Sequence, residues 1–104
     1  MNELPKPFQD FTNDFPDVAK LYETLLAATQ DAGPLDDRTR RLVKLAIAVG
    51  GRLEGAVRAH ARQARASGVP VAELDHVVLL ALTTIGLPST VAARTWIRDE
   101  LGIT

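Results

Sequence analysis

His60 is the residue of this sequence best placed to do chemistry, because it is the one polar side chain on an apolar helical stripe. At about 100° per residue, the side chains that share roughly 100° of arc with it are Leu53, Ala56, Val57 and Ala64. An imidazole in an apolar pocket can act as a general acid or base, since burial and neighbouring charges tune its pKa. The alternative is a structural histidine that bonds a backbone carbonyl, and the pattern alone does not decide between them.

Charged side chains near His60 in sequence point to salt bridges rather than to a catalytic pair. Glu54 lies about 120° around the helix from His60, on a stripe with Arg58, Arg62 and Arg65. Its i, i+4 spacing to Arg58 favours a solvated ion pair. A catalytic pair of Glu54 with His60 is therefore not expected.

A basic cluster opens the helix that precedes His60, formed by Arg38, Arg40, Arg41 and Lys44. Guanidinium groups recognise carboxylates in bidentate geometry, so this cluster could hold an acidic ligand. Asp36 and Asp37 stand beside it, so local neutralisation by these two carboxylates is the favoured interpretation and the ligand site is the alternative.

Several chemistries are excluded or not expected. The chain has no cysteine, so thiolate catalysis, disulfides and Cys-ligated zinc are impossible. His60 and His76 are too far apart to form a helical metal pair, and His76 follows Glu73 and Asp75 on a stretch typical of a solvated face. Twelve Lys and Arg against thirteen Asp and Glu give a net charge of −1, so nucleic acid is not an expected partner.

Length and composition predict one globular domain. The chain has 104 residues, of which 46% are hydrophobic and 24% charged. Its longest apolar runs, 45–49 and 77–82, are far shorter than the roughly 18 residues of a membrane span. The start, MNELPKPF, lacks the basic and apolar regions of a secretory signal. We expect a cytoplasmic protein with no membrane association.

Apolar periodicity and the positions of Pro and Gly predict an all-α fold with an N-terminal arm and about five helices. The arm covers 1–15 and a single-domain helical bundle covers 16–104. The five helices are expected from Pro16 to Gly33, Asp36 to Gly50, Arg52 to Ser67, Pro70 to Ile85 and Pro88 to Leu101. The second and fourth are apolar on most sides, so we expect one at the centre and part of the other against a second subunit.

All three phenylalanines lie in the arm, at Phe8, Phe11 and Phe15. Their i, i+3, i+7 spacing would place the three rings on one side of a helix. Packing of these rings on the body or on a neighbouring subunit is the favoured interpretation. An aromatic box for a ligand is the alternative.

Two consecutive stretches resemble the carboxymuconolactone decarboxylase and alkylhydroperoxidase D superfamily: LDDRTRRLVKLAIAVGGRLEGAVRAHARQARASG and VPVAELDHVVLLALTTIGLPSTVAA. The family has a helix of the pattern Cys-x-x-Cys-x-x-x-His-x-x-x-Ala-x-x-x-Gly, and His60, Ala64 and Gly68 match its last three positions. Residues 86–88 resemble the Gly-x-Pro that opens the last family helix. The resemblance implies a helical bundle and a homo-oligomer, with a trimer or hexamer as the expected sizes.

The departures from the family pattern reduce the number of family reactions that this chain could catalyse. Leu53 and Ala56 stand where the redox branch has its cysteines, and Arg41 stands where it has a proton-relay glutamate. Without thiols the dithiol reduction of peroxides cannot occur. The decarboxylase branch also lacks these cysteines and keeps the histidine, although its His and Tyr before the Gly-x-Pro are Leu80 and Thr84 here.

We therefore expect a carboxymuconolactone decarboxylase-like protein that binds a small organic acid or lactone near His60, with lyase-type acid/base chemistry by that residue. Arg41, Leu53 and Ala56 are the expected ligand-binding residues. The alternative is a catalytically silent oligomeric binding or assembly module of the same fold, so the sequence leaves open whether the protein is an enzyme. Neither hypothesis includes a cofactor or a metal.

Overall fold

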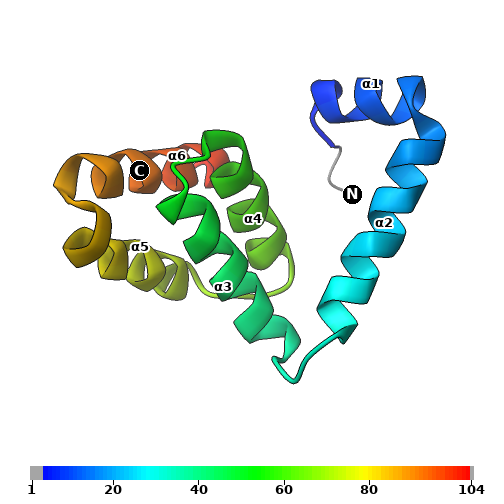
Figure 1. Cartoon of the computed structure of the whole chain (residues 1–104). Helices are drawn as coiled ribbons and strands as arrows, with labels where there is room; N and C mark the ends of the chain where they lie inside the picture. Colours follow the sequence, from blue (N-terminus) through cyan, green and yellow to red (C-terminus); the bar gives the residue numbers. More distant parts are fainter. Residues whose placement is uncertain (1–3, 104) are drawn as a thin grey trace. The chain divides into compact units, whose positions relative to one another are not determined.

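The computed structural model describes residues 4–103, and this part of the chain is all α-helical (Figure 1). Six helices follow one another: α1 (Lys6–Asp14), α2 (Pro16–Asp31), α3 (Asp37–Gly50), α4 (Glu54–Ala66), α5 (Val71–Ile85) and α6 (Leu87–Leu101). The all-α prediction is confirmed. None of the described helices is long and apolar enough to cross a membrane.

The chain divides into two compact units, residues 1–34 and 35–104. The sequence placed the boundary elsewhere, with an arm over 1–15 and a domain over 16–104, and that domain assignment stays a prediction. Residues 1–3 of the expected arm and residue 104 lie outside the described residues.

The first unit corrects the expected number of helices, because the arm itself contains α1. Pro5 is the N-cap of α1 and Pro7 lies in its first turn, where a missing backbone N–H costs no helical hydrogen bond. The two prolines therefore start this helix. The Phe11 and Phe15 ring centroids lie 5.2 Å apart. Each of the three phenylalanines is about half exposed, and their packing on a neighbouring subunit stays a prediction.

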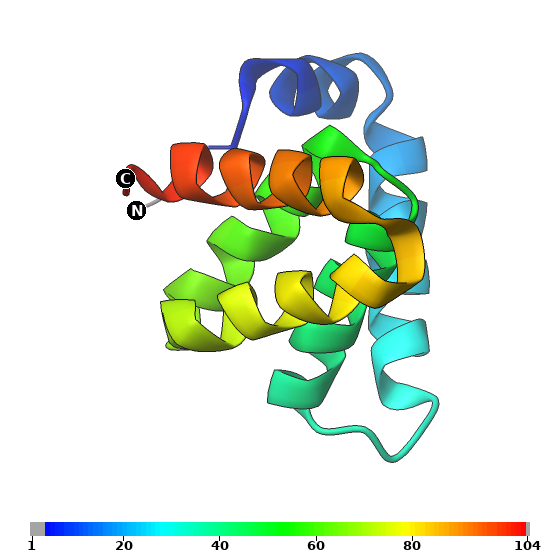
Figure 2. The same cartoon turned by 90° about the vertical axis from the view of Figure 1, so that its left-hand side faces the viewer.

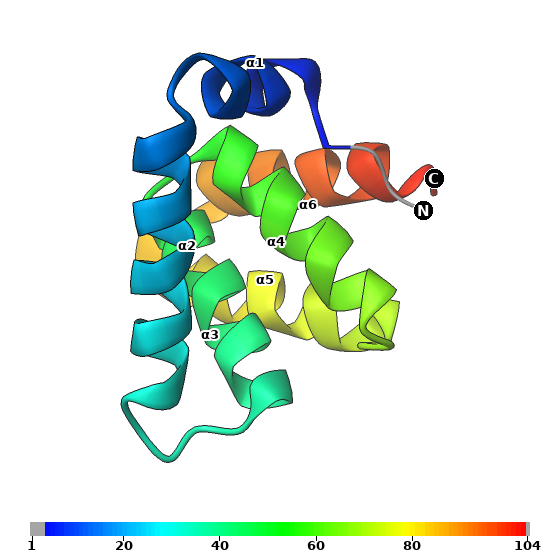
Figure 3. The same cartoon turned by 90° about the vertical axis from the view of Figure 1, so that its right-hand side faces the viewer.

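The second unit is a bundle in which each of α3–α6 packs against two others (Figures 2 and 3). The neighbouring pairs are α3 with α4, α4 with α6, α6 with α5 and α5 with α3. Eleven hydrophobic residues are buried at its centre: Leu45, Ala48, Val49, Val57, Ala61, Ala64, Val69, Leu74, Val78, Ala93 and Ile97. Trp96 packs partly buried against this core.

Local signals explain where the helices of this unit begin and end. Asp36 caps α3 by accepting a hydrogen bond from the Thr39 backbone N–H at 2.8 Å. The Thr39 side chain, and secondly this backbone hydrogen bond, hold the pKa of the Asp36 carboxyl below its usual value. Gly68 has a φ of +92° after α4, a conformation that needs glycine. Arg52, in the turn between α3 and α4, has a φ of +56° and donates to the Ser89 hydroxyl at 2.9 Å.

The two nearly all-apolar helices are only partly buried. One face of α3 contributes Leu45, Ala48 and Val49 to the core, whereas Ile47 on another face is 66% exposed. On α5, Leu74 and Val78 are buried and Leu79 and Leu80 are exposed. Apolar side chains thus extend beyond the core to the surface of this unit.

Candidate functional site

His60 lies on α4, a helix that packs against α3, and it is partly buried. Its neighbours Val57 and Ala64 on the predicted stripe are buried and Ala56 is partly buried, whereas Leu53 is exposed at the N-cap of α4. Within the described residues, the imidazole has no hydrogen-bond partner. The structure therefore does not supply the backbone carbonyl that a purely structural histidine was expected to bond.

Lys44 on α3 is the charged neighbour that acts on His60. Burial, and secondly the positive charge of Lys44, hold the pKa of His60 below its usual value. The ring is therefore neutral at pH 7. A neutral imidazole has one nitrogen that accepts a proton or hydrogen bond and one that donates.

Lys44 is also distinct among the cations of its unit. Within the described residues 35–103, every other Lys or Arg side chain has an ion-pair or hydrogen-bond partner, and Lys44 has none. Lys44 as a whole is partly buried. An unpaired ammonium beside a neutral imidazole is an arrangement that can bind an anion or a polarised carbonyl oxygen.

Sequence reasoning placed Lys44 in the basic cluster but missed its position beside His60. A signal for it exists, because Lys44 and His60 each stand eight residues from Arg52 at the turn. In an antiparallel helical hairpin, residues equidistant from the turn lie opposite each other.

The rest of the basic cluster is neutralised locally. The Arg41 Nε donates to Asp37 Oδ2 at 2.9 Å, and Arg40 lies 3.7 Å from the same carboxylate. Arg38 pairs with Glu73 of α5. The expectation of neutralisation by Asp37 is confirmed for Arg40 and Arg41. A ligand-binding role for Arg41 stays a prediction.

The arginine stripe on α4 forms an ion-pair network with α6. The Arg58 guanidinium donates to Asp99 at 2.7 Å and to Glu54 at 3.0 Å, and Arg62 donates to Glu100 at 3.0 Å. Asp99, and secondly Glu54, raise the pKa of Arg58. The predicted pair of Glu54 with Arg58 is confirmed, and the network fixes α4, which carries His60, against α6.

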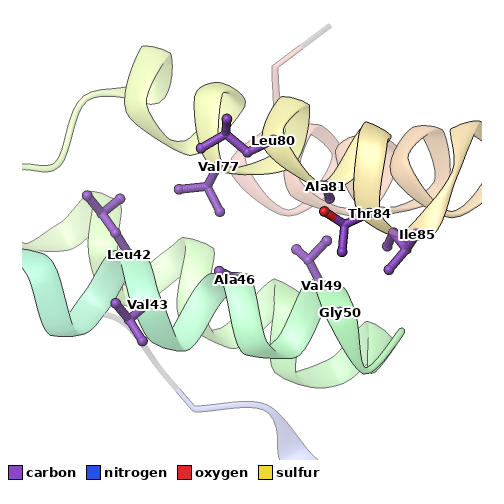
Figure 4. A pocket seen from close by; sticks show the side chains of 10 residues that line it. All are labelled: Leu42, Val43, Ala46, Val49, Gly50, Val77, Leu80, Ala81, Thr84 and Ile85. Atoms are coloured by element: carbon purple, nitrogen blue, oxygen red, sulfur yellow. The ribbon is translucent and has the colours of Figure 1, made fainter.

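An apolar cavity of about 370 Å³ lies elsewhere in this unit, between α3 and α5 (Figure 4). We call it the α3–α5 groove, and its lining residues are Leu42, Val43, Ala46, Val49, Gly50, Val77, Leu80, Ala81, Thr84 and Ile85. The Thr84 hydroxyl is the one side-chain oxygen among them, and no charged side chain lines the groove. None of the predicted site residues lines it. Lys44 does not line it either, because it lies about 160° around α3 from the middle of the groove wall.

Histidine, aspartate and glutamate side chains form no cluster of three or more able to hold a metal ion in residues 4–103. His76 is exposed on α5.

The comparisons with known proteins identify the family. The sequence profile of the carboxymuconolactone decarboxylase family matches residues 16–99, which is most of the chain. The chain belongs to this family. An uncharacterized protein of Haemophilus influenzae is 35% identical over 63 residues, which cover 61% of this chain and 56% of that protein. The chain thus spans about half the length of this curated relative. No solved structure matches.

Proposed function

We propose that this chain binds a small organic acid or lactone where α3 and α4 meet, with Lys44 and His60 as the contacting groups. One observation carries the proposal: the positive charge of Lys44, which has no ion-pair partner among the described residues, acts on the partly buried imidazole of His60, which has no hydrogen-bond partner there. The ammonium suits a carboxylate or the carbonyl oxygen of a lactone. Leu53 and Ala56 are the proposed apolar neighbours of the ligand, with Arg41 as a second cation.

The same pair of groups supports acid/base chemistry of the lyase type. When a carboxylate on the carbon next to the ligand's carbonyl leaves as CO₂, the electron pair of the broken C–C bond forms an enolate, and Lys44 can stabilise the negative charge on its oxygen. His60 donates its ring N–H proton to that carbon while its other ring nitrogen takes a proton from water. No thiol takes part, since the chain has none.

The test is a thermal-shift titration of the purified protein with succinate, adipate and γ-butyrolactone. A compound at about a hundred times its Kd adds roughly 2.7 kcal/mol and raises Tm by several degrees. We expect the shift to vanish in Lys44→Met and in His60→Gln. His76→Gln is the matched control, because it changes an exposed histidine of the same unit, and it should keep the full shift.

An assay of turnover distinguishes a protein that only binds the ligand from one that catalyses its reaction. Loss of a lactone or release of CO₂ in the wild type, abolished in His60→Gln while Lys44→Met mainly raises KM, would identify an enzyme. A shift that survives both substitutions, or the absence of any shift, contradicts the proposed site.

A second candidate function is a catalytically silent assembly module, and exposed apolar surface favours it. Among the large hydrophobic side chains, those at least half exposed include Leu21 and Leu25 of α2, Leu79 and Leu80 of α5 and Leu87 of α6. Monomers rarely expose so many together. In either function we propose a homo-oligomer, a trimer or hexamer, located in the cytoplasm.

A further inference from the structure

An unpartnered apolar stripe follows one face of α2. Val18, Leu21, Tyr22 and Leu25 are spaced i, i+3, i+4 and i+7, and each is between 53% and 71% exposed. We call these four residues the α2 stripe. Helices of this kind bind other proteins by laying their apolar face into a hydrophobic groove.

The α3–α5 groove has the chemistry and the length to receive such a helix. Its walls run from Leu42 to Gly50 on α3 and from Val77 to Ile85 on α5, each about 12 Å at 1.5 Å per residue. The α2 stripe runs from Val18 to Leu25, which is about 10 Å on the same scale.

Small residues in its walls leave the space of the α3–α5 groove. The walls include Ala46 and Gly50 on α3 and Ala81 on α5, and a Cβ added at Gly50 would meet no atom within 4 Å. Figure 4 shows the larger side chains, among them Leu42 and Val77, around these positions. Leu80 stands at the rim and is 62% exposed.

The charges of the two units are complementary. Residues 1–34 carry two lysines and six acidic residues, a net charge of −4, whereas residues 35–104 carry ten Lys or Arg and seven acidic residues, a net charge of +3. An acidic helical pair on one copy is therefore attracted to the basic helical unit of another copy.

We propose that the α3–α5 groove of one copy receives the α2 stripe of a second copy. Because the two surfaces differ, the contact is heterologous, and repetition of one such contact closes a ring such as a trimer. This docking rests on the homo-oligomer proposed above and adds the two surfaces that join its subunits.

The test measures the mass of the full chain by sedimentation velocity for Leu21→Asp on the stripe and Leu80→Asp at the groove rim. A carboxylate in an apolar contact should weaken association at least roughly tenfold in each variant. The matched controls are Ala27→Asp, on the opposite face of α2, and Val91→Asp, an exposed apolar position on α6. Both controls should assemble like the wild type.

Mixing the two dissociated variants decides which surfaces meet. An intact stripe on the Leu80→Asp chain can still dock in the intact groove of the Leu21→Asp chain, so the mixture should form a heavier species than either variant alone. Far-UV circular dichroism checks that each variant is folded. Should either unfold, Leu21→Ser and Leu80→Ser provide the same comparison.

The outcomes separate this docking from the proposals on which it depends. A monomeric wild type overturns both the homo-oligomer and the docking. An oligomeric wild type whose mass is unchanged by Leu21→Asp overturns the docking alone, as does a mixture that recovers no heavier species. Binding of acids at Lys44 and His60 is measured separately and does not enter this result.

Discussion

The two units of this chain contain similar amphipathic helices but differ in how many apolar side chains they bury. Both contain amphipathic helices with regular apolar stripes, yet no described residue of the first unit is buried, whereas the second buries eleven hydrophobic residues. In the second unit each helix packs against at least two others, which cover part of its apolar surface. An apolar stripe therefore specifies a core only where other helices are present to cover it.

The largest expected difference between the units is the loss of unfolding free energy when a leucine is replaced by alanine. Leu45 is fully buried and Leu21 is 71% exposed. Leu45→Ala should lower the free energy of unfolding by about 2–5 kcal/mol, because it leaves a cavity in the core. Leu21→Ala should change it by less than about 0.5 kcal/mol when the protein is dilute enough to be monomeric.

Urea unfolding at low and high protein concentration checks this difference. An equal cost for the two substitutions in dilute solution would break the comparison, since it would mean that the α2 stripe is covered within one copy. A cost of Leu21→Ala that grows with protein concentration would support the second-copy docking.

Ion pairs give a second comparison of the two units, with a smaller expected change in the free energy of unfolding. Arg58 is only 25% exposed, pairs with Glu54 of its own helix and joins α4 to α6 through two carboxylates, whereas the Lys6 side chain of α1, paired with Asp10, is 82% exposed. Arg58→Met should cost about 1 kcal/mol, at the upper end for such pairs, and Lys6→Met should cost nothing measurable. Unfolding midpoints in urea at low and high salt give both values. A cost for Arg58→Met that high salt does not reduce would show that packing of its stem matters more than its charge.

The smallest expected effect is a pH dependence confined to the second unit, which holds both histidines. Because folding lowers the pKa of His60, the unfolded chain binds its proton more readily. The contribution of His60 to stability is thus complete above about pH 6.5 and is lost as the pH falls through the folded pKa. Between pH 7.5 and 5, Tm should fall more in the wild type than in His60→Gln. A parallel fall in His60→Gln would assign the pH dependence to other groups.

Much of the fold could be predicted from sequence because its signals are local. Pro16, Asp36 and Gly68 stand where the helices begin or end, and helix ends depend on hydrogen bonds to residues three or four positions away. The helix in the arm was not predicted, although the spacing of the three phenylalanines fits one side of a helix. Pro5 is its N-cap and Pro7 lies in its first turn, the part of a helix that accepts proline without loss of a hydrogen bond.

Of the two residues of the candidate site, His60 was predicted from the sequence and Lys44 was not. His60 was found because it interrupts an apolar stripe, which a helical wheel shows directly. Lys44 was counted with a basic cluster, and its nearness to His60 depends on how α3 and α4 pack across the turn at Arg52.

The sequence by itself determined the helices, the family pattern around His60 and the exclusion of thiol chemistry, because each depends on residue types at short spacing. Only the tertiary structure decided which apolar side chains are buried, that Lys44 lacks a carboxylate while Arg41 has one, and that small residues of α3 and α5 leave a groove. Burial and electrostatic pairing depend on helices that are distant in the chain. They are settled only when those helices pack.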